Sequence, residues 1–248
     1  MFAIVSDIHG NLEALEAVCA DIGEKKVEAV FCLGDVIGYG PDPLACIDRA
    51  MQFDFTIMGN HDNAVFMEPT GFNTSAEVAV FWTRRALEAE PEEKRRRARF
   101  EFLAQMDEFR DRDSILFVHG SPRRPMHEYL FPDEGEANLT RLAESFDLVK
   151  QVCFVGHTHL PGVFTETMEF FTPAQVGYKY AVADRKVIVN VGSVGQPRDL
   201  DPRACYVTVD GRDIRWHRVD YDFKKTQEKI LATKELDEFL AARLAEGR

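Results

Sequence analysis

The first sixty residues alternate between short apolar runs and amphipathic stretches. The apolar runs at 2–6, 29–33 and 53–58 are long enough to be buried strands, and the residues between them are apolar at helical spacing. An order of strand, helix, strand, helix, strand indicates right-handed βαβ units and a largely parallel sheet. Because ligands bind at the carboxyl ends of the strands in such sheets, we expect a site where these runs end.

The next stretch predicts a helical hairpin. Residues 74–90 and 92–110 are apolar at helical spacing and are separated by Pro91. The basic run at 94–97 follows several glutamates, so we expect it to lie on a solvated, salt-bridged face of the second helix rather than in an anion site.

Later segments predict a mixture of strands and a closing helix. Apolar runs at 114–118 and 152–155 predict two more strands, with a helix at 134–146 between them. From Gly162 onward the short alternating runs predict antiparallel hairpins. Their expected strands are 163–165, 179–183, 186–191, 204–209 and 213–218, with turns at 184–185 and 210–211, and a charged helix follows at about 223–244.

Polar residues follow the predicted strands at five separate points. Five of the seven histidines lie just beyond an apolar run, beside two aspartates and an asparagine. The set is Asp7, His9, Asp35, Asn60, His61, His119, His157 and His159. Any one of these residues alone is typical of an ordinary turn or of a hydrogen-bonded structural histidine. Five strand ends that converge on one edge are harder to explain by packing, because burying so many polar groups is costly unless they bind a metal.

The residue types indicate which ions such a site would take. Oxygen and imidazole ligands without a thiolate suit manganese, iron, zinc, nickel or cobalt, and manganese is the ion we expect. Seven ligands are too many for one ion and fit two ions that share a carboxylate. The five cysteines are scattered and form no paired motif, so we expect buried thiols in a reducing cytoplasm.

Composition narrows the function classes. The chain of 248 residues is 45% hydrophobic, enough for one domain over residues 1–248 with a full core. A net charge of −12 argues against non-specific binding of long nucleic acid, which needs a basic face, but not against binding of small phosphorylated substrates through metal ions. No apolar run reaches the roughly 18–20 residues of a membrane span, and the N-terminus does not resemble a signal peptide.

Taken together and in order, the motifs resemble those of the calcineurin-like metallophosphoesterase superfamily. The resemblance covers nearly the whole chain and rests on Asp7 with His9, Gly34-Asp35 with Gly38, Gly59-Asn60-His61-Asp62, His119, and Gly156-His157 with His159. The chain length and the turn at 190–193 look most like the small bacterial phosphodiesterase branch. The resemblance implies an α/β (α+β) sandwich of two mixed sheets packed face to face and flanked by helices.

The same resemblance implies a role for each residue. Asp7, His9 and His159 would hold one metal, Asn60, His119 and His157 the other, and Asp35 would bridge the two. A hydroxide between the metals would attack a phosphodiester while protonated His61, oriented by Asp62, would give a proton to the leaving group.

The substrate is less defined than the reaction. We expect specificity to come from Tyr39, Arg123, Arg124 and Arg198 and from the helical region 73–91, and each arginine is alternatively a surface or structural residue. The small-residue turn at 192–199 could bring main-chain amides near an anion. A small nucleotide-like diester is the favoured substrate, and a phosphomonoesterase or a dinucleoside-polyphosphate hydrolase is the alternative.

A catalytically inactive scaffold of the same fold is a further alternative, which the complete ligand set and His61 argue against. Exposed loop aromatics at Phe66, Phe72 and Phe131 could mark the interface of a homo-oligomer.

Overall fold

The parallel strands predicted at the start of the chain form the centre of one of two sheets. The computed structural model describes residues 1–132 and 135–248. Its first sheet has the order β3-β2-β1-β11-β12-β9, in which β1, β2 and β3 are parallel and the remaining pairs are antiparallel. The strands are β1 (Phe2–Val5), β2 (Ala29–Cys32), β3 (Phe55–Thr56), β9 (Lys179–Ala181), β11 (Ala204–Asp210) and β12 (Asp213–Val219).

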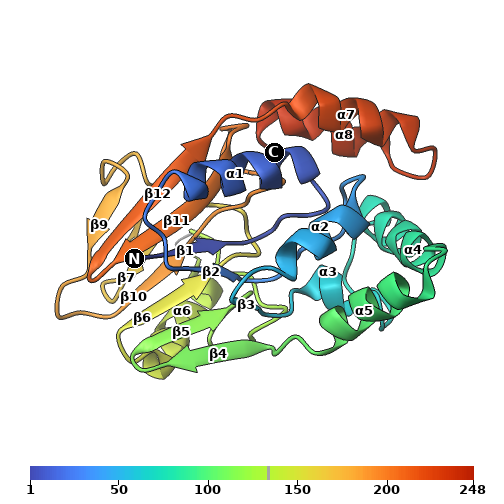
Figure 1. Cartoon of the computed structure of the whole chain (residues 1–248). Helices are drawn as coiled ribbons and strands as arrows, with labels where there is room; N and C mark the ends of the chain where they lie inside the picture. Colours follow the sequence, from blue (N-terminus) through green and yellow to red (C-terminus); the bar gives the residue numbers. More distant parts are fainter. Residues whose placement is uncertain (133–134) are drawn as a thin grey trace.

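The second sheet repeats this design. Its order is β4-β5-β6-β10-β7-β8, and β5, β6 and β10 are parallel. The strands are β4 (Phe109–Arg112), β5 (Ile115–Val118), β6 (Val152–Val155), β7 (Gly162–Thr165), β8 (Phe170–Phe171) and β10 (Val187–Asn190). The fold is therefore the expected sandwich of two mixed sheets with helices on the outside (Figure 1).

One apolar core joins the two sheets. Ile4 and Phe31 of the first sheet pack with Phe117 and Phe154 of the second, and the ring centres of Phe31 and Phe117 are 5.5 Å apart. Alternate residues of the same strands face outward onto helices, so these strands are buried on both faces and read as continuous apolar runs.

Helices cover the outer faces. They are α1 (Leu12–Gly23), α2 (Pro43–Ala50), α3 (Asn60–Asn63), α4 (Thr74–Glu88), α5 (Glu93–Ala104), α6 (Glu136–Leu148), α7 (Phe223–Ala232) and α8 (Glu238–Glu246). The expected start of α6 at residue 134 lies outside the described residues. Among the helices within 1–132 and 135–248, none is long and apolar enough to cross a membrane.

Three features of the predicted secondary structure were wrong. The second helix of the hairpin ends at Ala104, and residues 109–112 form the exposed strand β4 because their main chain pairs with β5. The turn at 184–185 does not close a hairpin, since β9 belongs to the first sheet and β10 to the second. The single C-terminal helix is broken into α7 and α8, whose caps are Asp222 and Asp237.

The exposed loop aromatics agree only in part with the expectation. Phe66 and Phe131 are exposed, but Phe72 is partly buried and its ring centre lies 4.6 Å from that of His61. Phe72 therefore belongs to the neighbourhood of the site rather than to a free surface.

The basic run on α5 is a salt-bridged face, as predicted, and Arg99 beside it has a different role. Arg97 pairs with Glu101 in solvent. Arg99, whose side chain is 5% exposed, donates from two nitrogens to the Asp48 carboxylate at 2.7 Å and also pairs with Glu90. This arginine ties α5 to α2.

Replacing Arg99 should therefore destabilise the fold. We expect Arg99→Ala to lower the free energy of unfolding by about 2 kcal/mol, because buried hydrogen bonds to charged groups are lost. Arg97→Ala is the matched control and should leave the denaturant midpoint unchanged, because its ion pair is exposed. Equal midpoints for the two variants would contradict this role of Arg99.

Candidate metal centre and active site

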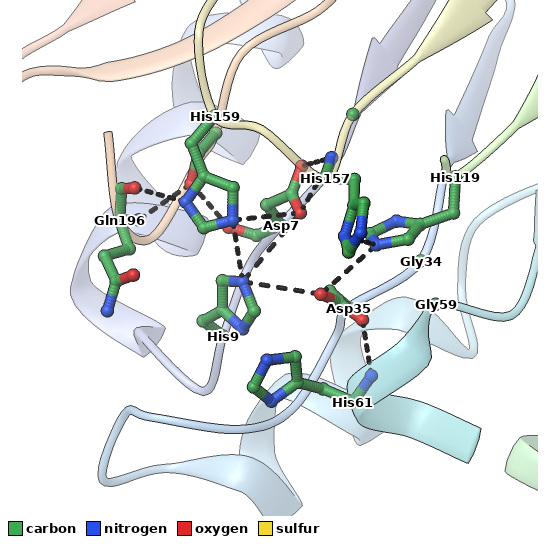
Figure 2. Close-up of polar contacts among 12 residues, drawn as sticks. Asp7, His9, Gly34, Asp35, Gly59, His61, His119, His157, His159 and Gln196 are labelled. Atoms are coloured by element: carbon green, nitrogen blue, oxygen red, sulfur yellow. Dashed lines mark hydrogen bonds and ion pairs between the residues drawn. The ribbon is translucent and has the colours of Figure 1, made fainter. Parts of the chain in front are cut away.

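The side chains singled out by the sequence converge at one edge of the sandwich. Each comes from the segment that follows a parallel strand: Asp7 and His9 after β1, Asp35 after β2, Asn60 and His61 after β3, His119 after β5, and His157 and His159 after β6. All eight are at most 8% exposed. Figure 2 shows the imidazole and carboxylate groups turned toward one another.

Two groups of potential ligand atoms share this space. In the first, the His159 Nε2 atom lies 3.2 Å from Asp7 Oδ1 and 3.1 Å from His9 Nε2. In the second, His119 Nε2 lies 3.2 Å from Asn60 Oδ1 and 3.0 Å from His157 Nδ1.

Asp35 lies between the two groups. Its Oδ2 atom is 3.6 Å from His9 Nε2 and 3.3 Å from His119 Nε2, so one carboxylate reaches both (Figure 2). Its Oδ1 atom accepts a hydrogen bond from the main-chain N–H of His61 at 2.8 Å. These buried His/Asp clusters fit a dinuclear metal site in which Asp35 is shared.

Main-chain carbonyls select the tautomer of three rings. The Nδ1–H groups of His9, His119 and His159 donate to the carbonyl oxygens of Ile37, Leu33 and Gln196, at 3.1, 2.9 and 2.5 Å. With Nδ1–H bound to a carbonyl, each ring turns its Nε2 atom toward its neighbours. A metal-binding histidine needs this outer hydrogen bond to fix its orientation and basicity.

The loops that carry these groups adopt unusual backbone conformations. Asp7, His9, Asp35, His157 and His159 all have φ between +50° and +64°. The left-handed region is unfavourable for residues with a Cβ, and such strain persists only where the surrounding structure imposes it. Its concentration at the predicted ligands indicates that the loops are shaped to aim these side chains.

Two glycines make room for the same loops. At Gly38, φ is +92° and an added Cβ would lie 2.3 Å from Nδ1 of His61. At Gly59, an added Cβ would lie 2.1 Å from Oδ1 of Asp35. Neither position has space for a side chain, which explains why both motif glycines accompany the polar residues.

The electrostatics keep the carboxylates charged and most rings neutral. Burial raises the pKa of Asp7 and of Asp35, but His159 beside the first and His119 beside the second hold both well below their usual range. Burial lowers the pKa of His9, His157 and His159. Charged carboxylates and neutral imidazoles are the forms that bind metal ions.

His119 is the exception among the rings. Burial opposes its charge, but the Asp35 carboxylate raises the pKa of His119 to about 9 in the protein alone. At neutral pH His119 therefore carries a proton on Nε2, the atom that would otherwise bind a metal ion. A metal ion must displace this proton to bind.

The structure does not support the predicted role of Asp62 as the group that orients the His61 ring. Its carboxylate accepts four main-chain N–H groups instead: Asp35 at 2.7 Å, Val36 at 3.0 Å, Ile37 at 3.3 Å and Gly59 at 3.1 Å. Asp62 is thus the clamp for the loop that presents Asp35.

His61 lies beside the ligand groups without a side-chain hydrogen bond. Its ring centre is 4.8 Å from that of His9 and 4.5 Å from that of Tyr39. Nδ1 is buried and has no partner among residues 1–132 and 135–248. Burial lowers the pKa of His61 to about 4, so in the protein alone the ring is neutral at neutral pH.

A cavity of about 550 Å³ opens directly onto this centre. Tyr39 and Arg198 contribute to its wall, as the sequence predicted. The lining residues are Tyr39, Asn60, His61, Thr70, Gly71, Phe72, Asn73, Ala76, His127, Tyr129, His157, Arg198 and Arg243. Its size is that of an ordinary small-molecule pocket.

Two predicted anion contacts are not at this cavity. Arg123 does not line it and pairs with Glu144 at 2.9 Å. The turn at 192–199 offers no nest of free amides, because the N–H groups of Val194 and Gly195 donate to the carbonyls of Ser6 and Asp7. That turn positions the Asp7 loop and supplies the Gln196 carbonyl to His159.

Sequence reasoning also missed residues of the cavity. Arg243 comes from α8 and Tyr129 from the loop after β5, where its ring stacks 3.6 Å from that of His157. Neither lies in a recognisable motif, and nothing in the spacing of a charged helix would have indicated that Arg243 faces the site.

Comparisons with known proteins agree with this geometry. The sequence model of the calcineurin-like phosphoesterase superfamily domain matches residues 1–213. The chain belongs to this superfamily, and it is a metallophosphoesterase with buried His/Asp clusters that could hold metal ions.

Individual relatives match over the whole chain. An uncharacterised protein of Methanocaldococcus jannaschii is 36% identical, with 100% of this chain and 98% of that protein covered. The crystal structure of a metallophosphoesterase from Sphaerobacter thermophilus is 35% identical, with a TM-score of 0.84 and 100% and 98% of the two chains covered. A hypothetical protein from Pyrococcus horikoshii, 20% identical with a TM-score of 0.75 and the same coverage, shares the fold.

The charge state of His119 predicts proton release on metal binding. Because its pKa is raised to about 9, metal binding at pH 7.5 should release about one proton more per chain than it does well above pH 9, in addition to any proton lost by a metal-bound water. Calorimetric titrations with manganese in buffers of different ionisation enthalpy measure it. Release that is absent at pH 7.5 would contradict a protonated His119.

The clamp role of Asp62 predicts a metal-binding defect without loss of a ligand. In Asp62→Asn an amide NH2 would face main-chain donors, and the displaced Asp35 loop should weaken metal affinity about 10- to 100-fold. Equilibrium dialysis measures this affinity, with the exposed Asp184→Asn as the control. An affinity equal to the control would show that Asp62 does not position Asp35.

Proposed function

We propose that the protein is a two-metal phosphodiesterase for small, nucleotide-like diesters. The observation that carries this proposal is the convergence of seven buried ligand groups beside a cavity. Main-chain carbonyls accept hydrogen bonds from Nδ1 of three of the imidazoles. His61, in the wall of the cavity, has no partner for its Nδ1 among the described residues. Such a site suits hydrolysis of phosphate esters, in which catalysis depends on positioning and on charge stabilisation.

The ligands divide between two ions. Asp7, His9 and His159 would hold one ion, and Asn60, His119 and His157 would hold the other. Asp35 would contact both. When bound, two divalent ions supply Lewis-acid stabilisation of phosphoryl charge and a water of lowered pKa, and manganese fits the oxygen and nitrogen ligands.

His61 would act on the leaving group. No carboxylate among the described residues hydrogen-bonds to its ring, so its protonation depends on what occupies the cavity. A phosphate ester bound next to the ring brings negative charge and raises the pKa of His61 from its low value in the protein alone. The ring could then donate a proton or a hydrogen bond to the departing oxygen.

The cavity supports a diester as substrate. Its volume of about 550 Å³ extends beyond the ligand groups along Tyr39, Phe72 and Tyr129, so there is room for a substituent on each side of the phosphorus. Aromatic walls of this kind suit planar groups such as nucleobases. A phosphomonoester would place a substituent on only one side of the phosphorus.

Turnover of bis-p-nitrophenyl phosphate against p-nitrophenyl phosphate, on metal-stripped protein resupplied with manganese, tests the proposal. We expect diester turnover, a reduction of kcat by about 10²- to 10⁴-fold in His61→Ala, and unchanged metal content in that variant. Asp35→Asn should lose both metal and activity. Preference for the monoester would contradict the diester assignment, and full activity of His61→Ala would remove His61 from the mechanism.

A further inference from the structure

Two arginines from distant parts of the chain line the cavity beside the candidate metal centre. Arg198 lies in the turn at 192–199 that supports His159, and Arg243 projects from α8. After burial, the charge of Arg198 is the main cause that lowers the pKa of Arg243 to about 10. Two cations that line one partly buried cavity are unfavourable unless an anion joins them.

Within the described part of the chain, neither Arg198 nor Arg243 forms an ion pair with an aspartate or glutamate side chain. Arg198 donates from Nη2 to the Gln196 side chain at 2.8 Å, and its buried Nε has no partner among the described residues. Arg243 donates from Nε to the main-chain oxygen of Arg248, the last residue of the sequence, so Arg198 is the arginine without any anionic partner among the described residues.

The buried arginines with structural roles look different. Arg99 pairs with Asp48 and Glu90, and Arg218 pairs with Asp199. Each of these two arginines has at least one acidic side chain as its partner. A purely structural explanation for Arg198 and Arg243 would predict an acidic side chain beside each of them, and among the described residues neither has one.

The cavity as a whole is suited to anions. Among residues 1–132 and 135–248, none that lines the cavity is an aspartate or a glutamate, although the chain has 42 acidic and 30 basic residues. The Arg198 guanidinium lies 5.9 Å from the ring centre of Tyr39, and that of Arg243 lies 5.2 Å from the ring centre of Phe239. Aromatic contacts of this type hold a guanidinium in place without neutralising its charge.

We infer that Arg198 and Arg243 form a subsite for a second phosphate group of the substrate, separate from the phosphate that is hydrolysed. Guanidinium groups match phosphate oxygens in bidentate geometry, whereas the scissile phosphate would belong to the metal ligands. The inference rests on the proposed function. It narrows the substrate class to small molecules with a further phosphate, either on a sugar or within a phosphoanhydride chain.

This subsite lies partly outside the region that defines the superfamily. Arg243 follows residue 213, where the match to the family ends. The metal ligands all lie within that match. The helices α7 and α8 would therefore add substrate selection to a catalytic centre that the superfamily shares.

Ligand binding to the metal-free protein tests the subsite independently of hydrolysis. Calorimetry would compare thymidine 5′-monophosphate with thymidine 3′,5′-bisphosphate and thymidine 5′-diphosphate, which place the second phosphate on the sugar or in an anhydride. We expect at least one of the last two to bind about tenfold more tightly than the monophosphate. Arg243→Gln should abolish this preference, Arg243→Lys should retain part of it, and the exposed control Arg185→Gln should retain all of it.

Three results would overturn the subsite: equal affinities of the three nucleotides, no detectable binding of either doubly phosphorylated ligand, or an undiminished preference in Arg243→Gln. Thermal unfolding of each variant confirms that it is folded. A preference that depends on Arg243 in a protein without phosphodiesterase activity would uphold the subsite and contradict the proposed function.

Discussion

The hydrogen bonds from three imidazole Nδ1–H groups to main-chain carbonyls are the interactions on which the site depends. They join His9 and His119 to the loop after β2, and His159 to the segment before β11. Each ring is thus oriented by a different segment of the chain from the one that carries it. The loop residues with positive φ would move to more favourable backbone conformations if these segments did not hold one another in place. The sandwich holds them because the Asp7 loop is hydrogen-bonded to the segments at Gly34, His157 and Gly195.

The distribution of charge follows from this arrangement. Asp7 and Asp35 are buried beside imidazoles, and their low pKa values keep the centre ready for cations. The lining of the adjacent cavity includes two arginines and, among the described residues, no carboxylate, which favours the anionic ligand proposed above. A strongly acidic chain can thus have a locally cationic cavity, which its net charge does not reveal.

The sequence predicted best those features for which a residue pattern has few alternative structural explanations. The apolar runs predicted the parallel strands, and the residues after them predicted the buried cluster, because strand ends share an edge. Side-chain orientation was harder to predict. Asp62 follows His61 in the chain but bonds to the amides of another loop, and the 184–185 turn crosses between sheets instead of closing a hairpin. Arg243 belongs to the site only because α8 folds back on it, which no local pattern encodes.

The most direct test of the central claim is the anomalous diffraction of crystals of the wild-type protein equilibrated with manganese. The account predicts two anomalous peaks, one within reach of Asp7, His9 and His159, the other within reach of Asn60, His119 and His157, with Asp35 between them. A single peak, or peaks away from these residues, would contradict a dinuclear centre.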